Sequence, residues 1–293
     1  MKILVVIDEY GWAFEFFARG WKRYSRHQID FLKWSEVSAE RVAASDIVWA
    51  MSSVVHARLA SRIALSPAKV VCGIVSLLPH EQAPNPSAIL ASVANCERAF
   101  QIAKERHPSA PNIYYLRGPI DGNEWTYADV SSNKRVGWSG NPSQPVKRVH
   151  LLNQIAGQHG GVSRKSDWGN HVFRPGRKRD DQLAFYRSIG CYVQVSLSEG
   201  ISQAMQEAFA CGVPVVATPA GDTAKLVPAE WLLPMDEEAC VREADKKIER
   251  LFSDRELARQ VGAANRKKFD SEGWCWSVRA GEYDTLMEKL KKC

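Results

Sequence analysis

The sequence predicts an α/β fold of two Rossmann-like, doubly wound domains with a C-terminal helical tail. The first observation is the length of 293 residues, enough for about two domains of roughly 150 residues each. The second is that short apolar runs alternate with segments of helical period, in two successive series. The third is that these runs are nearly continuous in apolar residues, which is typical of parallel strands buried on both faces.

The first series covers about the first 116 residues. Its expected strands are residues 2–8, 29–34, 46–51 and 69–76, with two further strands at Ala99–Ala103 and Ile113–Leu116. Its expected helices are residues 12–26, 37–44 and 54–65, the first because Trp12, Phe16 and Phe17 begin an aromatic pattern of helical spacing. Strands that alternate with helices favour right-handed βαβ units in one parallel sheet.

The second series follows residues 118–133, which are rich in Gly, Asp, Asn and Ser and form the best linker candidate. Its expected strands are residues 135–139, 191–196, 213–218 and 230–233, and its expected helices are 146–158, 180–189 and 202–211. From Glu237 onward the pattern is helical, with breaks near Ser253 and Gly273.

These elements predict an N-terminal domain of residues 1–125, completed by a helix at about 274–293, and a second domain of residues 126–273. Ligands of doubly wound sheets bind at the carboxyl ends of the strands. We therefore expect the binding site in a cleft between the two domains.

The composition is that of a globular protein, 45% hydrophobic and 25% charged, and excludes a disordered or fibrous chain. The formal charge of +6 suits phosphate ligands but does not by itself indicate nucleic-acid binding. Seven scattered cysteines without a C-x-x-C pair favour neither a disulfide framework nor a zinc site. The short apolar N-terminus and the lack of a run of 18 apolar residues favour a cytoplasmic protein without a membrane span.

The segment most indicative of function is Ser196–Gly221, SLSEGISQAMQEAFACGVPVVATPAG. Glu199 lies just before the expected helix and Glu207 lies two turns into it, so the two acids could hold two hydroxylated parts of one ligand. Gly200 allows close backbone approach, and the start of the helix offers N–H groups to an anion between them. Taken singly, Glu207 is as readily explained as a surface residue, and Glu199 as a helix cap, as either is explained as a ligand-binding residue.

Glu199-Gly200 through Glu207-Ala208, followed by Ala210-Cys211-Gly212-Val213-Pro214-Val215, resembles the E-x7-E segment of family-four retaining glycosyltransferases of the GT-B fold. The flanking residues 185–196 and 219–225 are similar to the elements around that segment. The resemblance is close over residues 182–227 and weaker elsewhere. It implies transfer of a sugar from a nucleoside diphosphate sugar, with a UDP-sugar as first choice, to an acceptor hydroxyl with retention of configuration.

The resemblance also implies roles in donor binding. Glu199 would contact the transferred sugar, Glu207 the ribose, and the backbone of Gly200, Ile201 and Ser202 the sugar and phosphate oxygens. Lys147 would neutralise the diphosphate. Residues 137–141 (Gly-Trp-Ser-Gly-Asn), which include the donor-site candidate Asn141, depart from the usual Gly-Arg pattern, so Arg135, Arg148 or the 174–179 cluster is left as the second cation.

On the acceptor side, Gly11 and Trp12 follow the first strand, where relatives place a glycine loop against phosphates and acceptor. An ordinary turn with a core Trp is an equal alternative. His80 is the candidate for the family's active-site histidine, with Glu199 and Lys147 as the other catalytic candidates, and His56 is its rival. The segment around Trp276 is similar to the one that returns to pack on the first domain.

The acceptor class stays open. Compact relatives occur in phage genomes, where some modify hydroxymethylated pyrimidines in DNA, and the basic stretch RPGRKR suits such an acceptor. Its candidate contacts are Arg174, Arg177, Lys178 and Arg179. Lipid-linked, glycan and small-molecule acceptors are the alternatives.

Two other functions stay open as well, a nucleotide-sugar 2-epimerase of the same fold and a non-catalytic nucleotide-sugar binding module. The sequence has no D-x-D triplet, so we expect no metal and no cofactor beyond the donor co-substrate. It also has no P-loop and no G-x-G-x-x-G motif.

Overall fold

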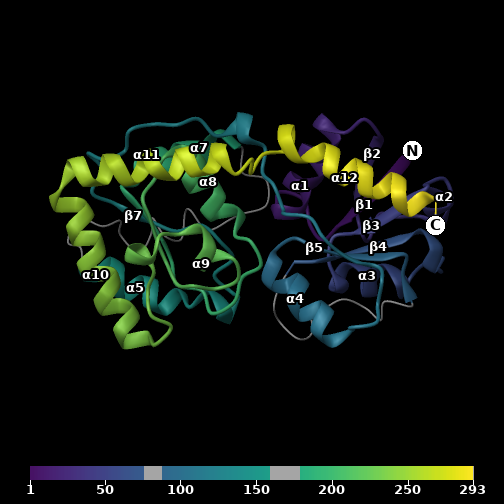
Figure 1. Ribbon diagram of the computed structural model, residues 1–293, viewed down its shortest axis with the longest axis horizontal. Helices are drawn as coiled ribbons and strands as arrows, with labels where there is room; N and C mark the ends of the chain where they lie inside the picture. The colour runs from purple at the N-terminus through teal and green to yellow at the C-terminus, as the bar shows by residue number, and fades with distance from the viewer. Residues whose placement is uncertain (76–87, 159–178, 293) are drawn as a thin grey trace. The chain divides into compact units, whose positions relative to one another are not determined.

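The computed structural model describes residues 1–75, 88–158 and 179–292 (Figure 1). The chain divides into two compact units: unit 1 is Met1–Asp121 with Cys275–Cys293, and unit 2 is Gly122–Trp274. Each unit is an α/β body around a parallel sheet. None of the helices in the described part of the chain has the length and apolar character needed to cross a bilayer.

Unit 1 contains a six-stranded sheet in which every neighbouring pair is parallel. Its strands are β1 (Lys2–Ile7), β2 (Gln28–Lys33), β3 (Ile47–Ala50), β4 (Val70–Ile74), β5 (Ala91–Ala94) and β6 (Ile113–Tyr115). Their order is β2-β1-β3-β4-β5-β6, so β1 lies between β2 and β3, and Val5 pairs with both Phe31 and Trp49. The order reverses between β1 and β3, the position where doubly wound sheets bind ligands.

The helices of unit 1 are α1 (Ala13–Tyr24), α2 (Ala39–Ala43), α3 (Ser53–Ala60), α4 (Glu97–Arg106) and α12 (Trp276–Lys291). The last of these lies beside α1, because the chain returns to unit 1 at its C-terminal end (Figure 1). Trp276 stacks on Trp21 with ring centroids 6.2 Å apart, and both contact Phe17. The buried carboxylate of Asp284 accepts a hydrogen bond from the indole nitrogen of Trp21 at 2.9 Å, which fixes α12 in this packing.

The expected strand at Ala99–Ala103 is wrong. These residues belong to α4, in which Ala99 and Ala103 are both buried and lie four residues apart on one face. Cys96 caps this helix by accepting the N–H of Ala99. The fifth strand is instead β5, whose sequence ASVA has small residues and lacks the run of β-branched side chains that would have indicated it.

Unit 2 contains a three-stranded parallel sheet of β7 (Val136–Gly137), β8 (Cys191–Gln194) and β9 (Val215–Ala217), in that order. Its α-helices are α5 (Val149–Gln158), α7 (Arg179–Ser188), α8 (Gln203–Cys211), α9 (Thr223–Leu226), α10 (Glu237–Ser253) and α11 (Arg255–Ser271). The helix α11 crosses α8 closely at Gly262, where an added Cβ would lie 2.1 Å from the carbonyl oxygen of Gly212.

The expected strand at residues 230–233 is also wrong. Residues Ala229–Trp231 form a 3-10 turn after Pro228, and only a single bridge joins Leu232 to Ala217 of β9. The expected linker at residues 118–133 is not an exposed tether, because Trp125 and Val130 within it are buried. Trp125 packs edge-on against Tyr186 of α7 at 5.5 Å, which ties this stretch to unit 2.

Candidate functional site

The loop after β8 is held in place by backbone contacts to its neighbours. The N–H of Leu197 donates to the carbonyl of Val146 at 2.8 Å, and the hydroxyl of Thr218 donates to the carbonyl of Ser196 at 2.6 Å. The N–H of Asp222 donates to the carbonyl of Gly200 at 3.3 Å. The segment that carries Glu199 is therefore fixed between the turn before α5 and the loop after β9.

Glu199 and Lys147 form an ion pair at this edge of the sheet, with Nζ 2.6 Å from Oε1. Lys147 ends the 3-10 turn Pro145–Lys147, fifty-two residues before Glu199 in the chain. Their side chains are only 19% and 11% exposed, so solvent screens the pair less than it would an exposed one. The structure thus brings together two of the residues singled out from the sequence.

Arg148 anchors the turn that presents Lys147. Its backbone is left-handed, with φ of 46°, and its side chain is 2% exposed. Its Nε donates to the carbonyl of Val195 at 2.6 Å and its Nη1 to the carbonyl of Met235 at 2.7 Å. Nε and Nη1 are therefore taken up by backbone carbonyls, whereas the buried Nη2 has no hydrogen-bond partner in the described part of the chain.

Glu207 lies inside unit 2 on α8, with 5% exposure. The hydroxyl of Tyr186 on α7 lies 2.9 Å from its Oε2 and 3.0 Å from the carbonyl of Ala204. Burial, and next the charge of Glu207, raise the pKa of Tyr186 well above its usual value. The hydroxyl therefore stays protonated and acts as a donor toward the carboxylate.

Tyr192 on β8 is electrostatically coupled to both acids. Its pKa is raised first by burial and then by the charges of Glu199 and Glu207. Its hydroxyl donates to the carbonyl of Ser139, after β7, at 3.3 Å. The sequence pattern did not predict a role for Tyr186 or Tyr192. The feature that could have indicated such a role is their position in the helix and the strand that precede Glu199 and Glu207.

The start of α8 is capped by a side chain and packs closely against the loop after β9. Ser202 is its N-cap, and its hydroxyl accepts the N–H of Met205 at 3.2 Å. Gly221, with φ of 58°, packs against the loop so closely that a Cβ would lie 2.3 Å from the carbonyls of Glu199 and Gly200. Ile201 and Gly200 are buried beside it.

Asn141 lies in the loop between β7 and the turn at Lys147. Its Oδ1 accepts hydrogen bonds from the backbone N–H of Ser143 at 3.0 Å and from the Ser143 hydroxyl at 2.7 Å. This is a local turn motif that shapes the loop. These two contacts of Asn141 therefore organise the loop itself.

In unit 1, the polar groups of the loop after β1 bond to α1 and to the end of β2. Gly11 has φ of 75°, and its N–H donates to the buried carboxylate of Glu15 one turn into α1. Glu9 pairs with Lys33 at 2.6 Å. Trp12 is half-buried at the N-cap of α1.

Of the two candidates for the active-site histidine, the structure describes His56 and not His80. His56 lies half-buried in α3, where burial lowers its pKa. His80 lies outside the described residues.

Most of the predicted DNA-contact stretch also lies outside the described residues, namely Arg174, Arg177 and Lys178. Arg179 begins α7, but its side chain is not among those described. Over the ranges that the structure covers, no group of three or more His, Cys, Asp or Glu side chains could hold a metal ion.

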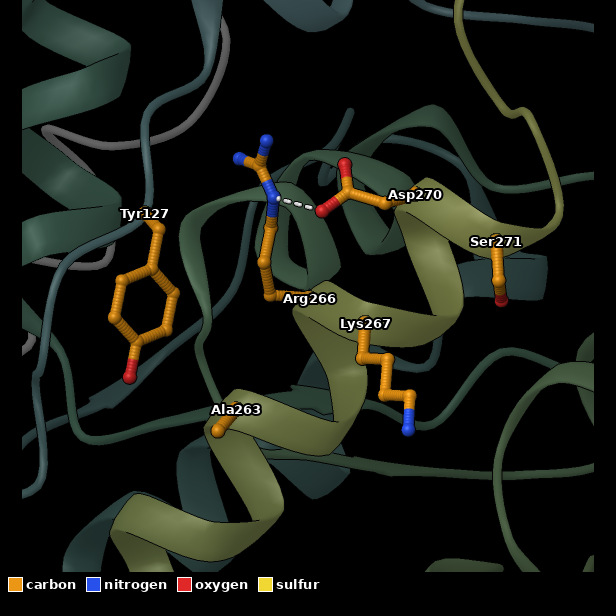
Figure 2. Close-up of a pocket in the computed structure, with 6 residues that line it drawn as sticks. All are labelled: Tyr127, Ala263, Arg266, Lys267, Asp270 and Ser271. Carbon is orange, nitrogen blue, oxygen red and sulfur yellow. Dashed lines mark hydrogen bonds and ion pairs between the residues drawn. The ribbon is translucent and has the colours of Figure 1, made fainter.

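A separate hollow of about 700 Å³ lies along α11 (Figure 2). It is lined by Tyr127, Ala263, Arg266, Lys267, Asp270 and Ser271. Figure 2 shows the Arg266 guanidinium turned toward Asp270, with Nε 2.9 Å from Oδ2. None of its lining residues is a predicted site residue, and Arg266 also donates to the carbonyls of Trp125 and Ala210. We therefore assign the candidate site to the acids of unit 2 and not to this hollow.

Comparison with known proteins gives a family match in unit 2. Residues 156–268, less than half of the chain, match the family described as glycosyl transferases group 1. No curated protein sequence matches the chain.

Solved structures match over most or all of the chain. HepE from Anabaena, in complex with UDP-glucose, is 15% identical with a TM-score of 0.69, and the match covers 100% of each chain. Sucrose-phosphate synthase from Thermosynechococcus elongatus is 13% identical, with a TM-score of 0.70 and 99% of each chain covered. TarM from S. aureus is 16% identical, with a TM-score of 0.61 over 82% of this chain and 54% of that one.

At these identities the structural likeness shows the fold, which is GT-B as the sequence predicted. Together with the family match over residues 156–268, it indicates a glycosyltransferase.

Proposed function

We propose that the protein is a retaining glycosyltransferase that takes a sugar from a nucleoside diphosphate sugar, with UDP as the nucleotide, and transfers it to an acceptor hydroxyl. The observation that carries the proposal is the pair of carboxylates, Glu199 and Glu207, on either side of the α8 N-terminus, with Lys147 on the first of them. The HepE structures, which are complexes with UDP-glucose and with UDP, support this nucleotide.

In this proposal the ion pair between Lys147 and Glu199 exchanges partners when the donor binds. The ammonium turns to the diphosphate, and the carboxylate of Glu199 accepts from hydroxyls of the sugar. As the glycosidic bond breaks, negative charge grows on the departing diphosphate, and Lys147 with the N–H groups at the start of α8 stabilises it. The attack by the acceptor on the same face, assisted by the leaving phosphate, is what the family resemblance implies.

The ribose role of Glu207 is tested by Glu207→Ala. Loss of a charged acceptor for the ribose hydroxyls should weaken UDP binding by about 1.5–3 kcal/mol. Calorimetry with UDP, GDP and ADP measures it, and Glu243→Ala on the exposed face of α10 is the control in the same unit. Equal UDP affinity in Glu207→Ala and the parent would refute the role.

For the acceptor we propose DNA with hydroxymethylated pyrimidines, supported by the basic stretch at residues 174–179. Binding should weaken with salt, with a log–log slope of about −0.9 per phosphate contacted on duplex DNA. Changing Arg174, Arg177, Lys178 and Arg179 to Gln should flatten that slope and leave donor hydrolysis intact. A gel shift at about 150 mM salt that shows no binding to hydroxymethylated or plain DNA leaves lipid-linked, glycan and small-molecule acceptors.

The epimerase alternative is separated by the products. A donor incubated without acceptor gives free sugar and nucleoside diphosphate with a transferase, whereas a 2-epimerase gives an isomer of the sugar. Metal independence and a cytoplasmic location stay predictions. Activity that survives an excess of EDTA would support the first of them.

A further inference from the structure

Tyr186 joins two helices at the carboxylate that we assign to the ribose. Its ring is 1% exposed and packs edge-on against Trp125 at 5.5 Å and against the neighbouring Phe185 at 5.1 Å. The end of α7 is held in turn by the side-chain amide of Asn133, which donates to the carbonyl of Arg187 at 2.9 Å. The hydroxyl of Tyr186 therefore reaches α8 from a rigid base.

A hydrogen-bond donor can restrict the carboxylate of a helical glutamate to one orientation. The side chain of Glu207 has three rotatable bonds, and it is buried where an unbonded carboxylate is costly. The Tyr186 hydroxyl, at 2.9 Å from Oε2, favours one orientation of the carboxylate. A carboxylate has about four lone-pair sites, so it can still accept hydrogen bonds from a ligand.

We propose that Tyr186 is a positioning residue that orients Glu207 and thereby makes the chain select ribonucleotides over nucleotides that lack ribose hydroxyls. This inference rests on the ribose role of Glu207 proposed above. It adds Tyr186, on a different helix, to the residues that bind the ribose indirectly. It also predicts that the hydroxyl of Tyr186 controls how well the protein distinguishes ribonucleotides from nucleotides without ribose hydroxyls.

The test compares the affinities of UDP and 2′,3′-dideoxy-UDP for the parent and for Tyr186→Phe. Phenylalanine keeps the ring that packs against Trp125 and removes only the hydroxyl. UDP should bind Tyr186→Phe about tenfold more weakly than it binds the parent, whereas dideoxy-UDP should bind both alike. Because both ligands are measured on one preparation, their affinity ratio does not depend on the folded fraction.

The matched control is Tyr283→Phe in unit 1. Tyr283 is also a buried tyrosine, and its hydroxyl donates to backbone carbonyls of Leu116 and Arg117, so its loss should leave both nucleotide affinities unchanged. A second check is a double-mutant cycle: in a Glu207→Ala background, Tyr186→Phe should have no further effect on UDP affinity.

The outcomes separate the two proposals. If the parent itself binds UDP and dideoxy-UDP equally, the ribose role of Glu207 fails. If the parent discriminates and Tyr186→Phe discriminates equally well, only the positioning role of Tyr186 is overturned. A variant that loses affinity for both nucleotides by the same factor also overturns it, since that result shows a general structural role.

Discussion

Each unit has an ion pair that joins two segments beside its strand ends, and the pair in unit 2 is the more buried. In unit 2, the side chains of Lys147 and Glu199 are 19% and 11% exposed. In unit 1, the side chains of Lys33 and Glu9 are 26% and 43% exposed, and the N–H of Gly11 donates to Glu15. Two sheets of the same class thus differ in how strongly solvent screens the ion pair at their strand ends.

The largest effect is expected at Lys147. Lys147→Ala should lower kcat by about 10²–10³ and weaken donor binding less, because the ammonium acts mainly on charge that develops as the bond breaks. Steady-state kinetics with a UDP-sugar would measure both constants. Glu15→Ala in unit 1 is the control variant. If it lowered kcat as much as Lys147→Ala does, the proposed difference between the loop after β1 and the loop that carries Glu199 would be refuted.

A large effect on stability is expected at Arg148. Arg148→Ala leaves two carbonyls without their buried donor and should destabilise the protein by about 2–4 kcal/mol. Arg148→Gly should lose about 1 kcal/mol less, because glycine adopts the left-handed backbone without strain. Urea unfolding of the two variants gives the difference, and an alanine variant as stable as the glycine variant would remove the argument from backbone strain.

Gly221→Ala should have a smaller effect that is confined to unit 2. The added Cβ meets the carbonyls of Glu199 and Gly200 at 2.3 Å and also requires an unfavourable φ of 58°, for a cost of about 1–3 kcal/mol. Since the strain falls on the loop of Glu199, UDP affinity should fall together with the melting temperature. Gly281→Ala on α12, where nothing lies within 4 Å of the new Cβ, is the matched control. It should leave UDP affinity unchanged and raise the melting temperature slightly, because alanine favours a helix over glycine by about 0.5–1 kcal/mol.

The smallest effect concerns His56 and pH. Burial lowers the pKa of His56 in the folded protein below its ordinary value of 6.5. The unfolded chain then binds more protons at mildly acid pH, so stability should fall as the pH drops through about 6.5 toward the folded pKa. His56→Gln should lessen this decline in melting temperature between pH 7 and pH 5, and an unchanged pH profile would show that His56 does not contribute.

The fold was predictable where strands are long and rich in branched residues. KILVVI, KVVCGIVS and the helices beyond Glu237 were located from their pattern, because periodicity reports burial directly. The strand ASVA (β5) was missed, and residues 99–103 (AFQIA) of α4 were wrongly predicted as a strand, because a short interior strand of small residues has no periodic pattern of its own.

The site was predictable in part. Glu199, Glu207 and Lys147 were singled out from a motif and from spacing, but the 2.6 Å contact between Lys147 and Glu199 depends on how β7 and β8 pair. The contact of Tyr186 with Glu207 could not be predicted, because it depends on how α7 packs against α8. The contact of Arg148 with Val195 could not be predicted either, because it depends on the left-handed backbone of Arg148.

A structure of the protein with UDP bound would test the account most directly. We predict that the ribose hydroxyls lie within hydrogen-bonding distance of the Glu207 carboxylate, with the diphosphate at Lys147 and the start of α8, and that the 2.6 Å contact between Lys147 and Glu199 has opened. UDP bound elsewhere, for example in the hollow beside Tyr127 and Arg266 in Figure 2, with the Lys147–Glu199 pair intact, would contradict it.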